Sequence, residues 1–274
     1  DCVVPYEETT RETSPAGPES VTYYVTLSAK ALDEIKTGSS VHGRGTDHAA
    51  GIVIVPAGVR LSAREIAVAA SCGGAMLTVS RLPKIAVVST GDELVEVDAI
   101  VAPHQVRRSN DYALRAALIA AGWPQVERFH FHDMRHEIEH QLWHILAEFD
   151  VVLLTGGISK GKYDYLPEVL ETLGVKKIFQ GVAQRPGKPF WFGQSARHKS
   201  VFALPGNPVS AYTCLHRYVL PALAQARGLT PPLPRPIRLG AAVKFAPPLA
   251  YLVPVRLSAA ANGDQVALPD PFNT

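Results

Sequence analysis

The sequence predicts an α/β fold, with a central, mostly parallel sheet flanked by β-rich segments. Between residues 84 and about 226, short apolar runs alternate with helix-like stretches, which is typical of a parallel sheet. Residues 1 to about 82 are rich in Val, Ile and Thr with Gly and Pro between them, and a strand-rich tail follows a stiff proline-rich linker at 230–236. We therefore expect a β-rich domain over 1–82, an α/β domain over 83–229 and a C-terminal β domain over 230–274.

Each domain has recognisable elements. In the first, strands are expected at 21–27 and 51–56, and a helix at 62–72, where Ser62 and Glu65 form a capping box. The central helices are expected at 110–121, 135–149, 165–173 and 208–225, several of them followed by a glycine. The tail predicts strands at 237–245 and 252–257.

Composition narrows the class of protein. The 274 residues carry a net charge of +2, with 47% hydrophobic and 19% charged residues, so neither nucleic-acid nor membrane binding is indicated. Cys2, Cys72 and Cys214 are odd in number and widely spaced, which favours a reducing compartment. There is no transmembrane-length apolar run and no signal peptide. We expect a cytoplasmic protein whose two ends are truncated, since the chain lacks an initial Met and a closing element.

Three apolar runs are each followed by a glycine-bearing polar loop and then a helix-like stretch. The loops begin near Gly91, Gly156 and Pro205. Loops of this kind converge at the carboxyl edge of an open α/β sheet, where ligands bind. Carboxylates, backbone amides and nearby cations suit a phosphate-bearing ligand held with a metal ion. The centre of the chain is therefore predicted to be an enzyme site.

The second loop, 156–163, nearly matches the P-loop pattern. Tyr163 occupies the position of the Ser or Thr that would hold magnesium, which argues against a P-loop nucleoside triphosphatase. Backbone N–H groups can still approach an anion here, and Asp164 can supply an oxygen to a metal ion. A glycine turn with Asp164 as a helix N-cap is the structural alternative.

A second motif, His136-Glu-Ile-Glu-His140, matches the helix of zinc proteases. A helical wheel places Ile138, Leu142, Ile145, Leu146 and Phe149 within about 100° of one another, which is a core face. His136, His140 and His144 then point to solvent. We expect at most an incidental surface metal site.

Two further segments are candidate ligand contacts. Arg185 and Lys188 lie on a rigid turn and predict an oxyanion clamp, although solvated loop cations are the alternative. Asn207 and Pro208 fit the start of a helix, and with Pro205 they fix the shape of a ligand wall. Ser109, Asn110 and Asp111 cap another helix, where a ligand can also bind.

Five motifs together indicate a family. They are Ser89-Thr-Gly-Asp-Glu-Leu94, Ser109-Asn110, the segment 156–164, Arg185-Pro-Gly-Lys-Pro189 and Leu204-Pro-Gly-Asn-Pro-Val-Ser-Ala211. In this order they resemble the molybdopterin molybdenumtransferases, the family of bacterial MoeA and the gephyrin E domain. The resemblance covers almost the whole chain and is strongest between residues 84 and 227.

The resemblance implies an activity and an architecture. Members insert molybdate into adenylated molybdopterin, releasing AMP, with a divalent cation that is usually Mg²⁺, and they are homodimers. A three-layer, MogA-like molybdopterin-binding domain lies between a β-rich domain and a small C-terminal β-barrel. Two alternatives stay open within the same fold: adenylation of molybdopterin, as in MogA-like domains, and a scaffold or binding module. A molybdate sensor is a third.

The resemblance also assigns residues. The catalytic positions match Asp92, Asp133, Asp164 and Lys188, of which Asp92 and Asp164 are metal ligands. The positions that bind substrate match Ser109, Asn110, Gly156, Gly157, Ser159, Lys162, Arg185, Pro205, Asn207 and Pro208. Gly181 replaces a lysine of the family, with Lys160 and Lys162 as substitutes. The family's Met-Asp-Gly motif and its C-terminal Gly-Ser-Gly-like segment have no counterpart. We expect Asp92, Asp164, Lys188 and Pro208 around one cleft.

Overall fold

The computed structural model describes residues 1–16, 20–157, 165–229, 235–259 and 265–270, without side chains for 13–22. The chain divides into two units: residues 1–57 with 61–75, and an α/β unit made of residues 58–60 and 76–274. No helix in the described part of the chain is long and apolar enough to cross a membrane.

The first unit is built from a hairpin and two helices. After a 3₁₀ turn at Tyr6–Glu8, strands β1 (Thr9–Ala16) and β2 (Ser20–Leu27) pair antiparallel. Helix α1 (Ala29–Glu34) follows directly. Helix α2 (Ala63–Ser71) has the predicted capping box between Ser62 and Glu65. The strand at 21–27 and the helix at 62–72 are thus confirmed.

The strand predicted at 51–56 is wrong, because this segment forms turns and irregular backbone. Gly51 has φ +90°, in the left-handed region, and Val53 is 74% exposed. No described strand lies alongside the segment to complete its hydrogen bonds. β-Branched residues such as Val and Ile favour a strand only where they can pack against a neighbouring strand or the core.

A six-stranded sheet forms the centre of the α/β unit, in the order β6-β3-β7-β11-β10-β8. Strands β6, β3, β7 and β11 are parallel, whereas β10 pairs antiparallel with both β11 and β8. The bounds are β3 Ile85–Thr90, β6 Val126–Phe131, β7 Val151–Thr155, β8 Val175–Gln180, β10 Trp191–Ser195 and β11 Ser200–Leu204. The predicted mostly parallel sheet is confirmed.

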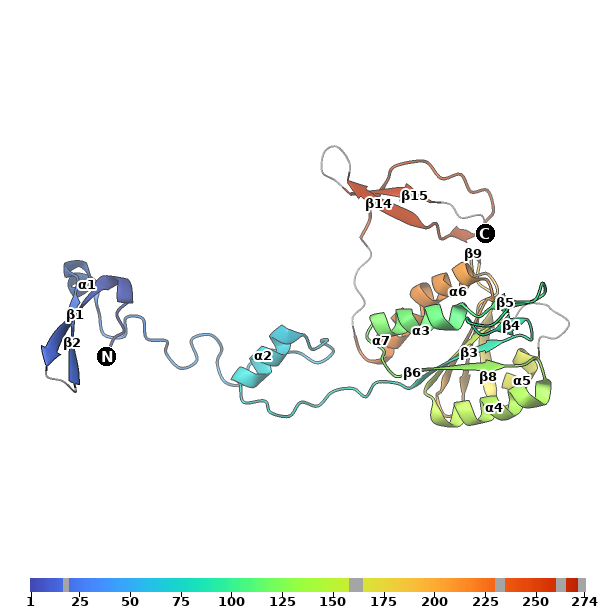
Figure 1. The fold of residues 1–274 in the computed structure, drawn as a ribbon, viewed down its shortest axis with the longest axis horizontal. Coiled ribbons are helices and arrows are strands. Elements are labelled where there is room, and N and C mark those ends of the chain that lie inside the picture. Colours follow the sequence, from blue (N-terminus) through green and yellow to red (C-terminus); the bar gives the residue numbers. More distant parts are fainter. Residues whose placement is uncertain (17–19, 158–164, 230–234, 260–264, 271–274) are drawn as a thin grey trace. The chain divides into compact units, whose positions relative to one another are not determined.

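Helices cover both faces of this sheet (Figure 1). Alternate residues of one strand enter different cores: Val88 packs with α4 and α5, whereas Val87 packs with α3, α6 and α7. The central strands are therefore buried on both faces and appear in the sequence as continuous apolar runs. The helices are α3 Asn110–Ala120, α4 Arg135–Glu148, α5 Leu166–Thr172, α6 Pro208–Cys214 and α7 Leu220–Ala226.

The predicted helix at 208–225 is continuous but not uniform. A π-helical turn at Leu215–Val219 joins α6 to α7. Pro221 lies in the first turn of α7, and since proline has no N–H it cannot continue a regular hydrogen-bond ladder.

Short strands make up the rest of the unit. Strand β4 (Leu94–Val95) pairs with β5 (Val106–Arg107), and β13 (Ala250–Tyr251) pairs with β9 (Gln184–Arg185). In the tail, β12 (Arg238–Leu239), β15 (Gln265–Pro269) and β14 (Val255–Ala259) form a three-stranded sheet.

The strands predicted at 237–245 and 252–257 are only partly correct. The first ends at Leu239, and Pro254 separates β13 from β14 because it has no ladder donor. The described residues form this small sheet; the β-barrel stays a prediction.

Candidate active site

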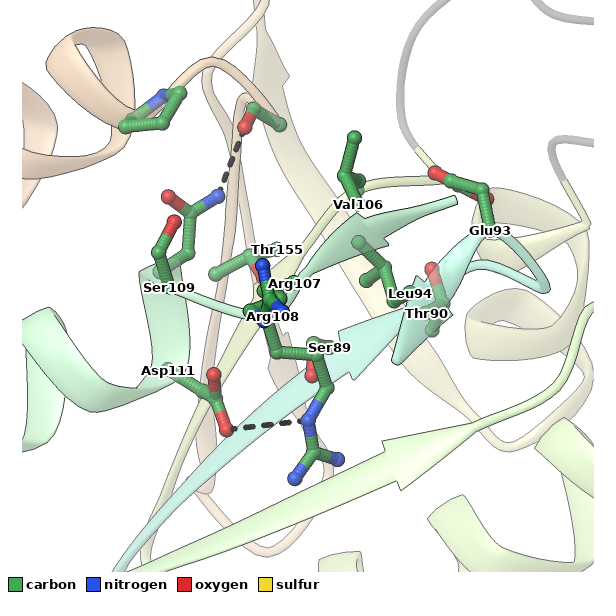
Figure 2. A pocket seen from close by; sticks show the side chains of 14 residues that line it. Ser89, Thr90, Glu93, Leu94, Val106, Arg107, Arg108, Ser109, Asp111 and Thr155 are labelled. Carbon is green, nitrogen blue, oxygen red and sulfur yellow. Dashed lines mark hydrogen bonds and ion pairs between the residues drawn. The ribbon is translucent and has the colours of Figure 1, made fainter. Parts of the chain in front are cut away.

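A cavity of about 290 Å³ opens at the carboxyl edge of β3, β7 and β11 (Figure 2). It lies where the loops after these strands meet the start of α3 and the short strands β4 and β5. Its walls are Ser89, Thr90, Glu93, Leu94, Val106, Arg107, Arg108, Ser109, Asn110, Asp111, Thr155, Gly156, Gly206 and Pro208. This is the position at which an open α/β sheet binds ligands.

Four of the residues predicted to bind substrate line the cavity: Ser109, Asn110, Gly156 and Pro208. The Asn110 side chain joins two of the loops, because its Nδ2 donates a hydrogen bond to the Gly206 carbonyl at 2.8 Å. Ser109 occupies the N-cap position of α3, yet its side chain makes no capping hydrogen bond. Its hydroxyl is thereby not used by the helix.

The loop between β11 and α6 has the geometry that the sequence indicates. Asn207 caps α6, with its Oδ1 accepting a hydrogen bond from the Ser210 backbone nitrogen at 3.2 Å. Pro208 occupies the first helical turn, and its exposed ring forms part of the cavity wall. Pro205 is buried at the end of β11, and neither Pro205 nor Asn207 lines the cavity.

The loop after β7 requires glycine at two positions. Gly156 and Gly157 have φ of +89° and +62°, which L side chains rarely adopt. A Cβ at Gly156 would lie 2.8 Å from the Thr90 carbonyl oxygen, and one at Gly157 would lie 2.6 Å from Leu166 Cδ1. The two glycines therefore let this loop approach the end of β3. Gly157 does not line the cavity, and the predicted Ser159, Lys162 and Asp164 lie outside the described residues.

Two of the predicted aspartates are neighbours beyond the ends of β3 and β6. Asp92 Oδ1 accepts a hydrogen bond from the Asp133 backbone nitrogen at 3.1 Å, and it lies 3.2 Å from His132 Nδ1. Neither aspartate lines the cavity, although Glu93, the residue after Asp92, does. The described residues contain no group of three or more His, Cys, Asp or Glu side chains arranged to hold a metal ion.

The predicted cations lie on the turn between β8 and β10, Arg185 at the end of β9 and Lys188 three residues later. Arg185 and Lys188 are both exposed, and Pro186 and Gly187 between them are buried. Since β10 runs antiparallel to β11, the turn before β10 lies at the carboxyl edge of the parallel strands. Asp92, Lys188 and Pro208 thus adjoin one edge of the sheet, but of the three only Pro208 lines the cavity.

The cavity wall contains a charge network around the buried Asp111 that the sequence did not indicate. Asp111 is completely buried, with its Oδ2 3.1 Å from an Arg128 guanidinium nitrogen. The same oxygen lies 3.9 Å from Arg108 Nε (Figure 2). Arg108 also pairs with Glu96, and the Arg128 guanidinium stacks 3.5 Å from the centre of the Tyr112 ring. Burial alone would lower the pKa of Arg128, but Tyr112 and Asp111 raise it above its ordinary value.

The part that Arg108 plays was missed because the strands beside it are short. Strands β4 and β5 have two residues each, too few for any hydrophobic pattern. Their pairing brings Arg107 and Arg108 to the cavity, and Arg107 is held by the carbonyls of Val97 and Ala99 at 2.9 and 3.1 Å. The one sequence signal was the arginine pair directly before Ser109.

The zinc-protease motif on α4 is on the solvent face. His136, His140 and His144 are exposed, and Ile138, Leu142, Ile145 and Phe149 are buried in the core. The expectation from the helical wheel is therefore confirmed.

The fold and the cavity define an α/β domain with a candidate ligand site at the carboxyl edge of its sheet. Residues 86–225 match a family model described as a probable molybdopterin binding domain, and residues 1–73 match the MoeA N-terminal region, domains I and II. The chain is 40% identical over 222 residues to a molybdopterin molybdenumtransferase of Synechocystis sp., an alignment that covers 81% of this chain and 54% of the relative. It is 31% identical over 279 residues to a molybdopterin molybdenumtransferase of Staphylococcus epidermidis, covering 100% of this chain and 62% of the relative.

A solved structure agrees with these matches. The molybdopterin biosynthesis MoeA protein of Pyrococcus horikosii superposes with a TM-score of 0.73 at 28% identity, covering 99% of this chain and 63% of that one. The chain belongs to the MoeA family. It spans 54% and 62% of the length of the two relatives above.

Proposed function

We propose that this protein acts in molybdenum cofactor biosynthesis by inserting molybdate into adenylated molybdopterin, with release of AMP. The observation that carries the proposal is the cavity at the sheet edge, whose walls include Ser109, Asn110, Gly156 and Pro208 from three family motifs. The two relatives above are named as molybdopterin molybdenumtransferases. The similarity to the MoeA N-terminal region favours insertion over adenylation, since MogA-like domains stand alone.

The turn between β8 and β10, called the cationic turn because it carries Arg185 and Lys188, has a role that charge explains. Molybdate and the pyrophosphate of an adenylated pterin are both anionic, so their approach requires cations that offset their repulsion. Arg185 and Lys188 are presented to solvent at the carboxyl edge, where they would hold an oxyanion. Backbone N–H groups of the glycine loop and the Asn110 bridge would orient the substrate.

The carboxylates at this edge suit a hard divalent cation. The Asp133 backbone N–H donates a hydrogen bond to the Asp92 carboxylate. Mg²⁺ prefers one or two carboxylates, with waters and substrate phosphates as its other ligands. Asp92 and Asp164 are the proposed metal ligands, and Ser159 and Lys162 remain proposed substrate contacts. Bound Mg²⁺ would polarise the phosphoanhydride. Homodimerisation, cytoplasmic location and the boundaries 1–82, 83–229 and 230–274 belong to the same proposal.

One assay tests the reaction. Purified protein is incubated with adenylated molybdopterin, molybdate and Mg²⁺, and AMP and molybdenum cofactor are both measured. Molybdate-dependent release of AMP together with cofactor formation is expected. In a parallel incubation with ATP and molybdopterin, formation of adenylated molybdopterin would instead indicate an adenylyltransferase. Tight substrate binding without either product would indicate a binding module.

A further inference from the structure

The cationic turn is a tight hairpin tip between β8 and β10. The Val182 backbone nitrogen donates to the Lys188 carbonyl at 2.9 Å, and Gly181 donates to Phe190 at 2.8 Å. The turn is one-sided: Arg185 and Lys188 face solvent, and Gln184, Pro186 and Gly187 are buried. The buried residues of the turn therefore fix the backbone from which the Arg185 and Lys188 side chains project.

Gln184 is the polar residue at the centre of that buried side. It is only 3% exposed, and both ends of its amide are used. Its Nε2 donates a hydrogen bond to the Pro186 carbonyl at 2.8 Å, and its Oε1 accepts one from the Tyr218 hydroxyl. A buried amide with both ends satisfied fixes its neighbours, since each lost bond would leave a buried polar group unpaired.

Two side chains of the α6–α7 helical segment complete the support. Cys214 Sγ donates to the Gly187 carbonyl at 3.8 Å, and the Tyr218 ring stacks on Phe190 with centroids 4.8 Å apart. Burial raises the pKa of Cys214 to about 12 and also raises the pKa of Tyr218. Both groups thus keep the protons that they donate at neutral pH.

Gly187 shows how closely this support contacts the turn. Its φ is +94°, and a Cβ there would lie 2.6 Å from both Cys214 Sγ and Gln184 Nε2. On another side, β13 pairs with β9, so that Leu252 donates to the Arg185 carbonyl at 2.9 Å. The backbone that carries the two cations is therefore held by a strand and by a buried polar cluster.

We propose that Gln184, Tyr218 and Cys214 are positioning residues that hold Arg185 and Lys188 in place for one oxyanion. The proposal rests on the proposed function for the identity of that oxyanion, molybdate. Lys and Arg side chains are long and flexible, so a rigid backbone lowers the entropy lost when they bind an anion. The buried cluster supplies that rigidity without contacting the anion.

The test uses two conservative variants of the whole chain. Gln184→Met removes the amide at similar volume, and Tyr218→Phe removes the hydroxyl but keeps the ring on Phe190. Tyr212→Phe is the matched control, since Tyr212 lies on α6 and is 49% exposed. Binding of molybdate is measured by calorimetry, and AMP release gives KM for molybdate and kcat. Both test variants should weaken molybdate binding and raise its KM roughly tenfold, with kcat and circular dichroism little changed.

A double-mutant cycle separates positioning from general destabilisation. If Gln184 acts through Arg185 and Lys188, Gln184→Met should weaken molybdate binding less in a Lys188→Ala background than in the wild-type background. An equal loss in both backgrounds would overturn the proposal, as would normal binding by Gln184→Met and Tyr218→Phe when Lys188→Ala binds poorly. Failure of the wild-type chain to bind molybdate would also overturn it. Wild-type binding with this cycle but without AMP release would support positioning and reject the proposed reaction.

Discussion

Asp150 holds three segments together at the amino edge of the sheet, away from the cavity. Its carboxylate binds the Arg81 guanidinium through two contacts of 2.9 and 3.0 Å. It also accepts a hydrogen bond from the Lys84 backbone nitrogen at 2.9 Å, and Lys199 Nζ lies 3.4 Å away. The hydrogen bonds from Arg81, helped by Lys84 and Lys199 and opposed by burial, lower the pKa of Asp150 from 3.8 to about 2.

This shift predicts how much Asp150→Asn destabilises the α/β unit. The fall in pKa from 3.8 to about 2 corresponds to roughly 2.4 kcal/mol, at about 1.4 kcal/mol for each pH unit. Arg81 is 71% exposed and solvent screens the pair, so we expect a loss of about 1 to 2 kcal/mol at pH 7. The folded state favours the ionised carboxylate. The stabilisation is therefore complete above pH 3.8 and is lost as the pH falls towards 2.

Urea unfolding followed by tryptophan fluorescence reports on the α/β unit, because all three tryptophans, Trp123, Trp143 and Trp191, lie in it. Glu148→Gln is the matched control, since Glu148 forms a 2.9 Å ion pair with Lys84 in which both side chains are exposed. It should change stability much less. A loss for Asp150→Asn no larger than that of the control, or one that persists undiminished below pH 3, would refute the reasoning.

Three further substitutions test the site. Asp92→Asn should abolish most Mg²⁺-dependent AMP release but leave the urea midpoint nearly unchanged, because the side chain is 67% exposed; full activity would contradict the assigned role. Asp111→Asn should lower the free energy of unfolding by roughly 3 kcal/mol, because it leaves the buried Arg108 and the half-buried Arg128 without their carboxylate. A neutral result in urea unfolding would show that the network is dispensable. Gly157→Ala should lower the thermal midpoint by several degrees, since the new Cβ meets Leu166. Gly174→Ala is the control and should lower the midpoint less, because its Cβ enters open space and adds only the strain of a φ of +76°. Equal shifts in the two glycine variants would exclude the close contact as the cause.

Features that depend on neighbouring residues were predictable from the sequence. The capping box at Ser62, the Asn207 cap of α6 and the two faces of α4 each follow from spacing within one or two helical turns. The apolar runs of β3 and β7 indicated a parallel sheet for the same reason, because strands buried on both faces carry few polar residues. Several candidate residues then followed from the loops after these strands.

Strand prediction failed where the partner was missing or very short. The segment 51–56 has the composition of a strand, but no described strand pairs with it, and a single extended segment has no hydrogen-bonded ladder of its own. In the tail, the strand expected at 252–257 forms only from Val255, after Pro254. Composition gives the preference for extended backbone, and only the pairing decides whether a strand forms.

The sequence by itself determined the family motifs, the order of the central elements and the edge of the sheet at which the cavity opens. Only the tertiary structure decided that Asp111 is buried between Arg108 and Arg128, that Gln184 supports the cationic turn, and that Lys188 and Asp92 lie outside the cavity. The physical reason is distance along the chain. Caps, periodicity and turns arise within a few residues, whereas the burial of a charge and the approach of two loops depend on which strands the folded sheet places side by side.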